Sequence, residues 1–352
     1  MKTLITGGAG FIGSHLADYL LQTGHQVVVI DDLSTGSIDN IRGAKKSLRF
    51  EYHLDTIFNR PLLAELIDSV DVVFHLAAAV GVRNIVESPV RTIETNVRGS
   101  ELVLELAAKK SKRVLITSTS EVYGKASKIP FHEDDDLVLG PTSKARWSYA
   151  CSKMIDEFLA LAYYRERRLP VTVVVRLFNT VGPRQTGRYG MVLPSFVQQA
   201  LAGAPVTVFG SGEQSRCFSH VADIIQGLVQ CALADSTTGQ VFNLGSTEEV
   251  TMNALAEIVI AATAAASAIR HVSYEEAYGP GFEDMDRRVP DTSKAKHAFG
   301  FKPTHTLSDI VISVVEYYRE KLAVATLTEQ IGLSQAVGGT PLASAQLSSV
   351  GD

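Results

Sequence analysis

The sequence is poor in cysteine and has no long hydrophobic run. Its 352 residues include three cysteines, an odd number without the spacing of metal ligands: Cys151, Cys217 and Cys231. This scarcity argues against a disulfide-rich secreted fold and indicates a reducing, cytoplasmic setting. No metal site is predicted. The longest apolar region, residues 255–269, contains Glu257 and is too short to cross a bilayer, so a buried helix is expected there.

An excess of positive charge is also absent. The formal net charge is −5, which argues against DNA or RNA as a partner. The apolar N-terminal segment, MKTLITGGAGFIG, has glycines where a signal peptide needs a continuous hydrophobic stretch. With 45% apolar and 20% charged residues, the composition is typical of a globular enzyme of one large domain or two, with no membrane association.

Strand-like and helix-like segments alternate through the first half of the chain. This alternation predicts an α/β protein with a doubly wound parallel sheet, a Rossmann fold, and a smaller C-terminal substrate-binding domain. The expected strands are 2–6, 25–31, 71–78, 113–119 and 170–179, and the expected helices are about 12–23, 97–110 and 147–167. The expected domains are 1–178 (Rossmann, with later segments returning to it), 179–324 (mainly substrate-binding) and 325–352 (a weakly ordered tail).

A glycine-rich turn lies between the first expected strand and the first expected helix. In TGGAGFIG, Gly8, Gly10 and Gly13 satisfy G-x-G-x-x-G, and the motif read from Gly7 satisfies G-x-x-G-x-x-G. Such a turn lets backbone N–H groups approach a pyrophosphate at a helix N-terminus. Asp31 follows at the end of the second expected strand, where its carboxylate would accept from ribose hydroxyls. No Arg or Lys follows in DDLSTG, so the sequence favours NAD over NADP.

Tyr149 and Lys153 stand four residues apart in WSYACSK, on one face of an expected helix. A tyrosine must lose its proton to act as a base, but its reference pKa is about 10. Lowering that pKa to neutrality requires ~4 kcal/mol, which a nearby ammonium and the positive nicotinamide ring could supply together. The pair is a candidate base with its helper, although the same spacing occurs by accident on amphipathic helices.

Together these segments resemble the extended short-chain dehydrogenase/reductase family, in particular its nucleotide-sugar enzymes. The resemblance runs from Met1 to about Leu322 and includes HLAA (75–78), TNV (95–97), FNTVGPRQ (178–185) and GSGEQSRCFSHVAD (210–223). It implies bound NAD, a UDP-sugar substrate and a homodimer paired through helices at about 97–110 and 149–167.

The resemblance also implies roles for individual residues. Asp55 would approach the adenine, and Ala77 and Ala78 would line the dinucleotide. Asn179 and Arg216 would hold the substrate's diphosphate, for which a guanidinium has suitable geometry. The implied cofactor residues are Gly7, Gly10, Phe11, Ile12, Gly13, Asp31, Asp32, Asp55, Ala77, Ala78, Asn96, Tyr149 and Lys153. The implied substrate residues are Asn179, Arg188, Arg216 and Arg288.

The reaction depends on Glu121, which follows the expected strand 113–119. By the resemblance, the family's enzymes begin alike: Tyr149 takes the proton of the C4 hydroxyl while NAD takes the hydride. A 4-epimerase then returns the hydride to the other face of the sugar and has no use for a carboxylate near C5. A 4,6-dehydratase has Asp-Glu here, and the chain has Ser120-Glu121 instead.

The Thr119-Ser120-Glu121 pattern resembles that of UDP-glucuronate decarboxylases. Oxidation at C4 makes a β-keto acid whose carboxylate can leave, and C5 must then be protonated. In those enzymes an Arg within Arg-Lys-Pro-Asp completes the set; RRVPD supplies Arg288 here, with Arg287 as a second claimant. The implied catalytic residues are Thr119, Ser120, Glu121, Tyr149, Lys153 and Arg288.

The predicted function is therefore NAD-dependent decarboxylation of UDP-glucuronate to UDP-xylose. The alternative is a UDP-sugar 4-epimerase, acting on UDP-glucose and UDP-galactose or on UDP-glucuronate and UDP-galacturonate. A third reading, a non-catalytic NAD-binding protein, is disfavoured because Thr119, Tyr149 and Lys153 are all present.

Overall fold

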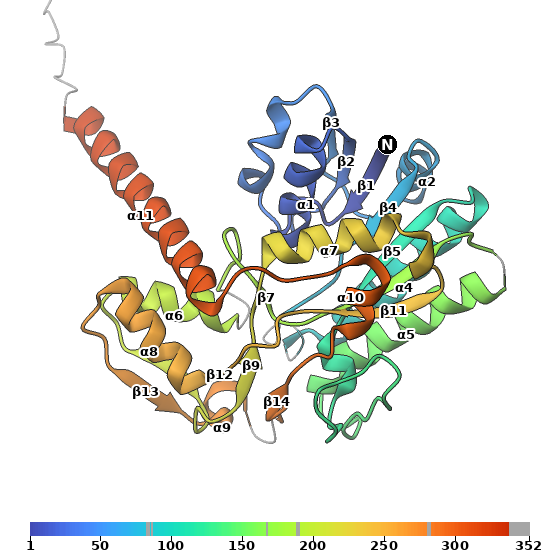
Figure 1. Cartoon of the computed structure of the whole chain (residues 1–352). Helices are drawn as coiled ribbons and strands as arrows, with labels where there is room; N and C mark the ends of the chain where they lie inside the picture. The colour runs from blue at the N-terminus through green and yellow to red at the C-terminus, as the bar shows by residue number, and fades with distance from the viewer. Residues whose placement is uncertain (82–84, 86, 167, 188–190, 280–282, 338–352) are drawn as a thin grey trace, which may run out of the picture.

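A seven-stranded parallel sheet forms the centre of the molecule (Figure 1). The computed structural model describes residues 1–337 except 82–84, 86, 167, 188–190 and 280–282. The strand order is β11-β6-β5-β4-β1-β2-β3, and all neighbouring strands run parallel. The chain builds outward from β1 in both directions, as in a doubly wound sheet. The Rossmann fold predicted from the sequence is confirmed.

The sheet strands mostly coincide with the short apolar runs of the sequence. They are β1 (Lys2–Thr6), β2 (Gln26–Ile30), β3 (Phe50–His53), β4 (Val72–His75), β5 (Arg113–Thr119), β6 (Thr172–Leu177) and β11 (Gln240–Leu244). The edge strand β3 has no fully buried residue. It therefore lacks the apolar run that marks a strand, and the sequence does not predict it.

Helices cover both faces of the sheet. Side chains of α1, α7 and α10 pack on one face, and side chains of α2, α4 and α5 pack on the other. Their bounds are α1 (Phe11–Gln22), α2 (Arg60–Asp68), α4 (Pro89–Lys109), α5 (Arg146–Arg165), α7 (Val221–Leu233) and α10 (Ser293–Phe299). Both faces of the sheet are thus buried, which is why its strands are nearly continuous apolar runs.

Segments from the second half of the chain return to the sheet. β11 pairs with β6 from Gln240 beside Val173 to Leu244 beside Leu177. α7 packs against α1, and α10 packs against β11 (Figure 1). One edge strand of the sheet and two of its covering helices therefore come from beyond residue 220.

A smaller unit lies beside the sheet, at the lower left of Figure 1. Its core includes Phe196, Leu255 and Ile310, contributed by α6, α8 and α11 and almost completely buried. Its main elements are α6 (Val192–Leu201), β8 (Val206–Phe209), β9 (Ser215–Cys217), β12 (Glu249–Thr251), α8 (Met252–Thr263), β13 (Ile269–Val272), α9 (Tyr274–Tyr278), β14 (Arg287–Arg288) and α11 (Leu307–Val337). β7 (Thr180–Val181) pairs with β10 (Ser219–His220) in a separate two-stranded sheet.

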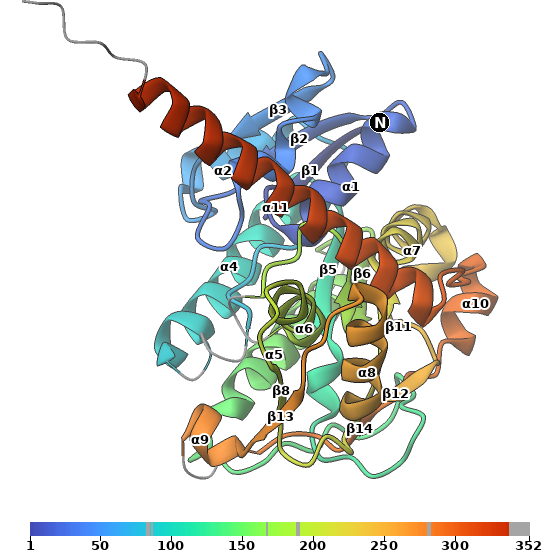
Figure 2. The ribbon, with the colours of Figure 1, turned by 90° about the vertical axis from the view of Figure 1, so that its left-hand side faces the viewer.

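Two expectations for the C-terminal half differ from the structure. The helix expected over 255–269 ends at Thr263, because Ala264 adopts the left-handed conformation with φ 55° and Ile269 begins β13. Helix α11 continues to Val337, past residue 325 where the sequence predicts the tail to begin (Figure 2). Residues 338–352 lie outside the described part. Within that part, no helix combines the length and apolarity needed to cross a membrane.

The place of β11 in the sheet core can be tested with two leucines. Leu244, at the end of β11, is fully buried, whereas Leu233, at the end of α7, is 41% exposed. Leu244→Ala should lower the free energy of unfolding by ~2–5 kcal/mol, because it leaves a cavity in the core. Leu233→Ala should change it by about 0.5 kcal/mol or less. Urea denaturation followed by Trp147 fluorescence measures both, and equal losses would contradict the assignment.

Candidate active site

Strand β5 carries Glu121 to the carboxyl edge of the sheet. The strand ends at Thr119, whose hydroxyl accepts from the backbone N–H of Glu121 at 3.3 Å and caps a short 3-10 helix, η3 (Ser120–Tyr123). Gly124, with φ 57°, ends this turn. Ligands of doubly wound sheets bind at this edge. The turn therefore fixes a carboxylate where a ligand would lie.

Helix α5 directs three polar side chains toward the same edge. Arg146, Tyr149 and Lys153 are three and four residues apart, which places them on one helical face. Arg146 and Lys153 are each 3% exposed, and Tyr149 shares a hydrogen bond with Thr119. Tyr149, one member of the predicted catalytic pair, thus lies against the end of β5.

Five charged side chains form the Glu121 cluster. The carboxylate pairs with Arg146 through Oε2, and its Oε1 lies 3.6 Å from Nη1 of Arg288. Asp284 lies between two arginines, with Oδ1 3.6 Å from Nη2 of Arg146 and Oδ2 2.9 Å from Nη2 of Arg216. The cluster consists of Glu121, Arg146, Arg216, Asp284 and Arg288. With three guanidinium groups and two carboxylates, it carries a net positive charge.

The short strand β14 separates the two arginines of RRVPD. The side chain of Arg288 is 13% exposed and faces Glu121, whereas that of Arg287 is 54% exposed and pairs with Glu249 at 2.7 Å. Neighbouring residues of a strand point to opposite sides. Of the two arginines left open by the sequence, Arg288 is the one in the cluster.

The charges of the cluster fix its protonation states. Burial alone would raise the pKa of Glu121, but the charges of Arg146 and Arg288 outweigh it and hold this pKa below its ordinary value. Glu121 is therefore a carboxylate at neutral pH. Burial and the charge of Arg216 lower the pKa of Arg288 to about 10, so this arginine is still charged. An anion bound beside Arg288 would relieve that repulsion.

Tyr149 is not yet a base in the protein alone. Its pKa is raised, first by burial and then by the charges of Glu121 and Asp156. Lys153 is expected from its spacing to lower that pKa. It instead donates to Oδ2 of Asp156 at 2.7 Å, one turn along α5. For Tyr149 to act as a base, its pKa would have to be lowered by a positive charge beside it or by the release of Lys153 from Asp156.

The predicted substrate residues lie where β9 adjoins the cluster. Asn179, which has a positive φ of 29°, donates through Nδ2 to the carbonyl of Cys217 at 3.0 Å. Such backbone strain is found preferentially at functional sites. The adjacent Arg216 is 4% exposed and is held by Asp284. Of the other two predicted substrate residues, Arg288 belongs to the cluster and Arg188 lies outside the described residues.

The glycine-rich turn is packed too tightly for larger residues. Gly7 has φ 73°, and a Cβ on Gly13 would lie 2.3 Å from the carbonyl oxygen of Gly7. Phe11 and Ile12 begin α1 directly after the turn. Among the described residues, no side chain caps the N-terminus of α1, and no acidic residue lies in its first turn. Its N–H groups and dipole can therefore receive a pyrophosphate, and the turn fits a dinucleotide.

Three predicted cofactor carboxylates are fixed by backbone hydrogen bonds. Asp31 is 7% exposed and accepts from the N–H groups of Ala9 and Leu33 at 2.9 and 2.8 Å. Burial raises the pKa of Asp31 despite these hydrogen bonds. Asp32 and Asp55 each accept from a backbone N–H just after them in the chain, at 2.9 and 2.7 Å. These contacts hold the carboxylates at the ends of β2 and β3.

The loop after β4 borders the glycine-rich turn. A Cβ on Gly7 would lie 2.9 Å from the backbone nitrogen of Ala77. Asn96 of α4 anchors the loop, because its Oδ1 accepts from the N–H of Ala79 at 2.8 Å. Ala77, Ala78 and Asn96 therefore lie beside the turn that would receive the dinucleotide.

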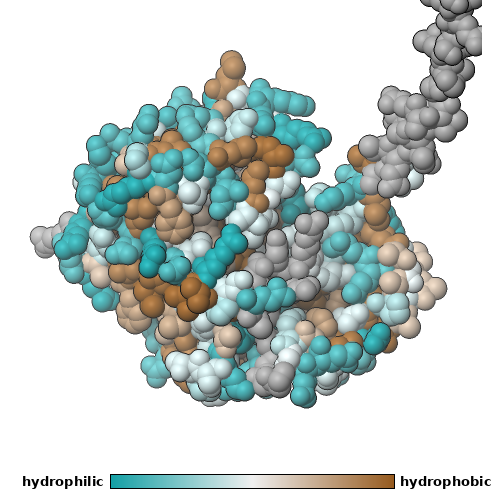
Figure 3. Space-filling model, turned by 180° about the vertical axis from the view of Figure 1, so that it is seen from behind, coloured by the Kyte–Doolittle hydropathy of each residue, from teal (hydrophilic) through white to brown (hydrophobic). Residues whose placement is uncertain are grey.

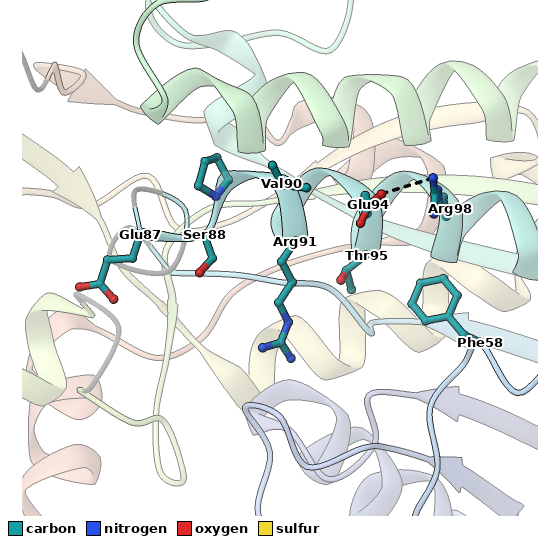
Figure 4. Close-up of a pocket in the computed structure, with 9 residues that line it drawn as sticks. Phe58, Glu87, Ser88, Val90, Arg91, Glu94, Thr95 and Arg98 are labelled. Atoms are coloured by element: carbon teal, nitrogen blue, oxygen red, sulfur yellow. Dashed lines mark ion pairs between the residues drawn. The ribbon is translucent and has the colours of Figure 1, made fainter.

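A separate pocket of about 600 Å³ opens along the first turns of α4 (Figure 4). Phe58, Arg91 and Thr95 are among its lining residues. None of its lining residues belongs to the Glu121 cluster. The pocket is therefore distinct from that cluster. Phe58 and Thr95 lie close in sequence to the predicted cofactor residues Asp55 and Asn96.

Two members of the cluster, Arg146 and Asp284, are not predicted from the sequence. A signal for Arg146 does exist, because it stands three residues before Tyr149 and so shares a helical face with it. Asp284 lies in FEDMD, far from Glu121 in the chain. No local pattern relates these two residues, and only the fold brings them together.

Known proteins resemble the chain over most of its length. The family model described as GDP-mannose 4,6 dehydratase matches residues 4–314. A UDP-N-acetyl-alpha-D-glucosaminuronate decarboxylase of Bacillus cytotoxicus is 39% identical over 330 residues, covering 91% of this chain and 98% of that protein. UDP-glucuronic acid decarboxylase 1 of Xenopus tropicalis is 35% identical, covering 91% of this chain and 73% of that protein.

A solved structure shows the same likeness in three dimensions. It is UDP-glucuronic acid 4-epimerase from Bacillus cereus in complex with UDP-glucuronic acid and NAD. The two structures superimpose with a TM-score of 0.81 at 29% sequence identity, covering 91% of this chain and 99% of the epimerase.

The glycine-rich turn makes a direct prediction about NAD binding. Gly13→Ala should weaken NAD binding at least ~10-fold, because the new Cβ would push against the backbone of Gly7 and Gly8 and displace the turn. Gly43→Ala is a matched control, since a Cβ there meets no atom within 4 Å. Calorimetric titration with NAD measures both. Equal affinities for the two variants would show that the turn does not receive the dinucleotide.

Proposed function

Because the chain belongs to the family described as GDP-mannose 4,6 dehydratase, the extended short-chain dehydrogenase/reductases, we propose that it is an NAD-dependent decarboxylase of a UDP-hexuronate. The proposed reaction converts UDP-glucuronate to UDP-xylose with loss of CO2. Two relatives that match nearly the whole chain are decarboxylases of UDP-linked uronates, which supports this reaction type.

The observation that carries the proposal is the Glu121 cluster beside Tyr149. A 4-epimerase needs a base and a cofactor at C4, whereas a decarboxylase also needs groups that act near C5 and C6. Arg288 offers a largely buried cation to the C6 carboxylate, and Glu121 lies 3.6 Å from that cation. The net positive charge of the cluster favours an anionic sugar over a neutral one.

NAD is the cofactor that the site fits. When bound, it accepts the hydride from C4 of the sugar and later returns it. The glycine-rich turn and the N-terminus of α1 would hold its pyrophosphate, and Asp31 would accept from a ribose hydroxyl. A 2′-phosphate at that position would be repelled by Asp31, so NADP is disfavoured.

The protein's side chains would serve the steps at C4, C5 and C6. Tyr149 accepts the proton of the C4 hydroxyl, which leaves a 4-keto sugar with a carboxylate in the β position. Arg288 orients that carboxylate. The C5–C6 bond then breaks, CO2 leaves, and the electron pair moves into the C4 carbonyl as an enolate. Glu121 relays a solvent proton to C5, and Tyr149 returns its proton to the C4 oxygen.

Two alternatives concern the sugar and the reaction. The likeness to the B. cereus epimerase supports a UDP-sugar 4-epimerase as the second candidate. The B. cytotoxicus relative supports a different C2 substituent, because it is named for UDP-N-acetylglucosaminuronate. That substrate has the same C4, C5 and C6 groups, so the roles of Tyr149, Glu121 and Arg288 would not change.

We also propose that the protein is a homodimer that pairs through α4 and α5. The two helices pack against each other, and together they expose Val90, Ile93, Ile155 and Phe158. Apolar areas also interrupt the hydrophilic surface seen from behind (Figure 3). Exposed apolar groups on adjacent helices favour burial against a second copy. A cytoplasmic location stays a prediction from the low cysteine count.

The decarboxylase function predicts two distinct phenotypes among three variants. Glu121→Gln and Arg288→Ala should each lower CO2 release from UDP-glucuronate by ~10² or more while NAD binding is kept, since each removes a group that acts after oxidation. Tyr149→Phe should prevent the initial oxidation, so no NADH absorbance should appear. CO2 release and separated nucleotide sugars are the measurements, with UDP-glucuronate, UDP-N-acetylglucosaminuronate and UDP-glucose as substrates.

Glu166→Gln is the matched control, because the Glu166 side chain is 59% exposed and lies far along α5 from the cluster. Its turnover should equal that of the wild type. The protein would instead be a 4-epimerase if it converted UDP-glucuronate to UDP-galacturonate without releasing CO2, and if Glu121→Gln left the rate of that conversion unchanged.

The dimer predicts a mass of two chains by light scattering at micromolar concentration. Ile155→Glu should give monomers, because it buries a charge at the proposed interface. Ile312→Glu, on α11, replaces an isoleucine of similar exposure, 46% against 39%, and should remain dimeric. A wild type with the mass of one chain would rule the dimer out.

A further inference from the structure

Arg146 belongs to the Glu121 cluster, but the proposed reaction assigns it no part. It is 3% exposed, pairs with Glu121 through Nη1 and lies 3.6 Å from Asp284 through Nη2. Its Nε is buried with no hydrogen-bond partner among the described residues. The charged contacts of this guanidinium are thus two carboxylates, one from η3 and one from the segment before β14.

The two oxygens of Glu121 are held unequally. Oε2 is paired with Arg146, whereas Oε1 is 3.6 Å from Arg288, which is longer than a hydrogen bond. The Nε of Arg288 is also buried without a hydrogen-bond partner in the described part of the chain. Arg288 therefore keeps donor capacity for a carboxylate that does not belong to the protein.

We propose that Arg146 is a positioning residue: by holding Glu121, it keeps Arg288 open for the C6 carboxylate of the substrate. The proposal rests on the proposed function, since it needs a sugar with a carboxylate at C6. Without Arg146, the nearest remaining cation for Glu121 is Arg288. Glu121 would then pair with that guanidinium and compete with the substrate for it.

The same loss would change the protonation of Glu121. The charged and titratable groups that face it are Arg146 and Tyr149 from α5, Arg288 from β14, and Asp284 from the preceding segment. Removing the charge of Arg146 leaves burial and Asp284 to raise the pKa of Glu121, with Arg288 alone opposing them. In the proposed relay, Glu121 must first be a carboxylate to take up the solvent proton that it passes to C5. Because a carboxylate is ionised only above its pKa, activity would then be lost at a higher pH as the solution is acidified.

A lysine at position 146 would restore only part of this arrangement. Its single ammonium can pair with Glu121, but it lacks the planar fork that lets Arg146 lie between Glu121 and Asp284 at once. Asp284 would still hold Arg216, to which it is paired at 2.9 Å. Binding of the diphosphate should therefore change little in either variant, and the defect should concern the uronate group.

The test compares Arg146→Gln and Arg146→Lys with the wild type, all loaded with NAD. Arg42→Gln is the control, because Arg42 is 77% exposed and pairs with Asp39 within one turn. Calorimetry gives the Kd of UDP-glucuronate and of UDP, which has no carboxylate. Rates of CO2 release from pH 5 to pH 9 give kcat and KM.

Arg146→Gln should weaken UDP-glucuronate about 10-fold or more and UDP less than about twofold, because one charge-assisted interaction is lost on the uronate side. The acid limb of the kcat profile should move up by about one pH unit. Arg146→Lys should lie between Arg146→Gln and the wild type, and Arg42→Gln should match the wild type.

Equal weakening of UDP and UDP-glucuronate, or a lower kcat with an unchanged pH profile and KM, would reduce Arg146 to a structural role. If Arg146→Gln does not fold, Arg146→Lys supplies the same comparison. If the wild type released no CO2, the proposed decarboxylase function would be wrong, but the Kd values of UDP-glucuronate and UDP could still be compared. Selective weakening of UDP-glucuronate over UDP would then still support the role of Arg146, and its absence would overturn it.

Discussion

A charge held mostly away from water needs a partner, and five charges at the carboxyl edge of this sheet, with side chains 3–21% exposed, are partners for one another. Leaving one of them unpaired would cost several kcal/mol. Glu121 and Arg146 come from the sheet domain, whereas Arg216 comes from β9, Asp284 from the segment before β14 and Arg288 from β14. The same pairing that shapes the site therefore also joins the two halves of the molecule. Removing one of these charges should therefore destabilise both the sheet domain and the smaller unit.

A second buried network supports the turn that holds Glu121. Arg176 of β6 donates to Glu157 of α5 at 2.8 Å and to the hydroxyl of Tyr123 at 2.9 Å. Tyr123 ends η3 and donates in turn to Oδ1 of Asn243 in β11 at 2.8 Å. All four side chains are buried. Three strands or turns and one helix are thus fixed to one another beneath the site, which limits how far Glu121 can move.

The sequence predicts those parts of the fold and the site that depend on residues close together in the chain. The apolar runs and the glycine-rich turn follow from neighbouring residues, and so does the helical face shared by Tyr149 and Lys153. Partners from distant segments leave no such pattern, which is why Asp284 is not foreseen beside Glu121. The sequence also does not show which of two possible partners a side chain takes. Tyr149 and Asp156 both lie one helical turn from Lys153, and the spacing alone does not show that Lys153 pairs with Asp156. Resemblance suggested that Arg288 belongs with Glu121, but the alternation of β14 was needed to separate it from Arg287.

β11 is synthesised long after its partner strand β6, and this delay has a consequence for folding on the ribosome. When β6 has emerged, its outer edge must wait for residues 178–239 before Gln240–Leu244 can pair with it. At ~5–20 residues per second, that edge stays open for several seconds. An unpaired apolar edge strand is a template for association between nascent chains. The sheet domain is therefore not an autonomous early-folding unit, because its last strand is synthesised only after α6, β8 and β9 of the smaller unit.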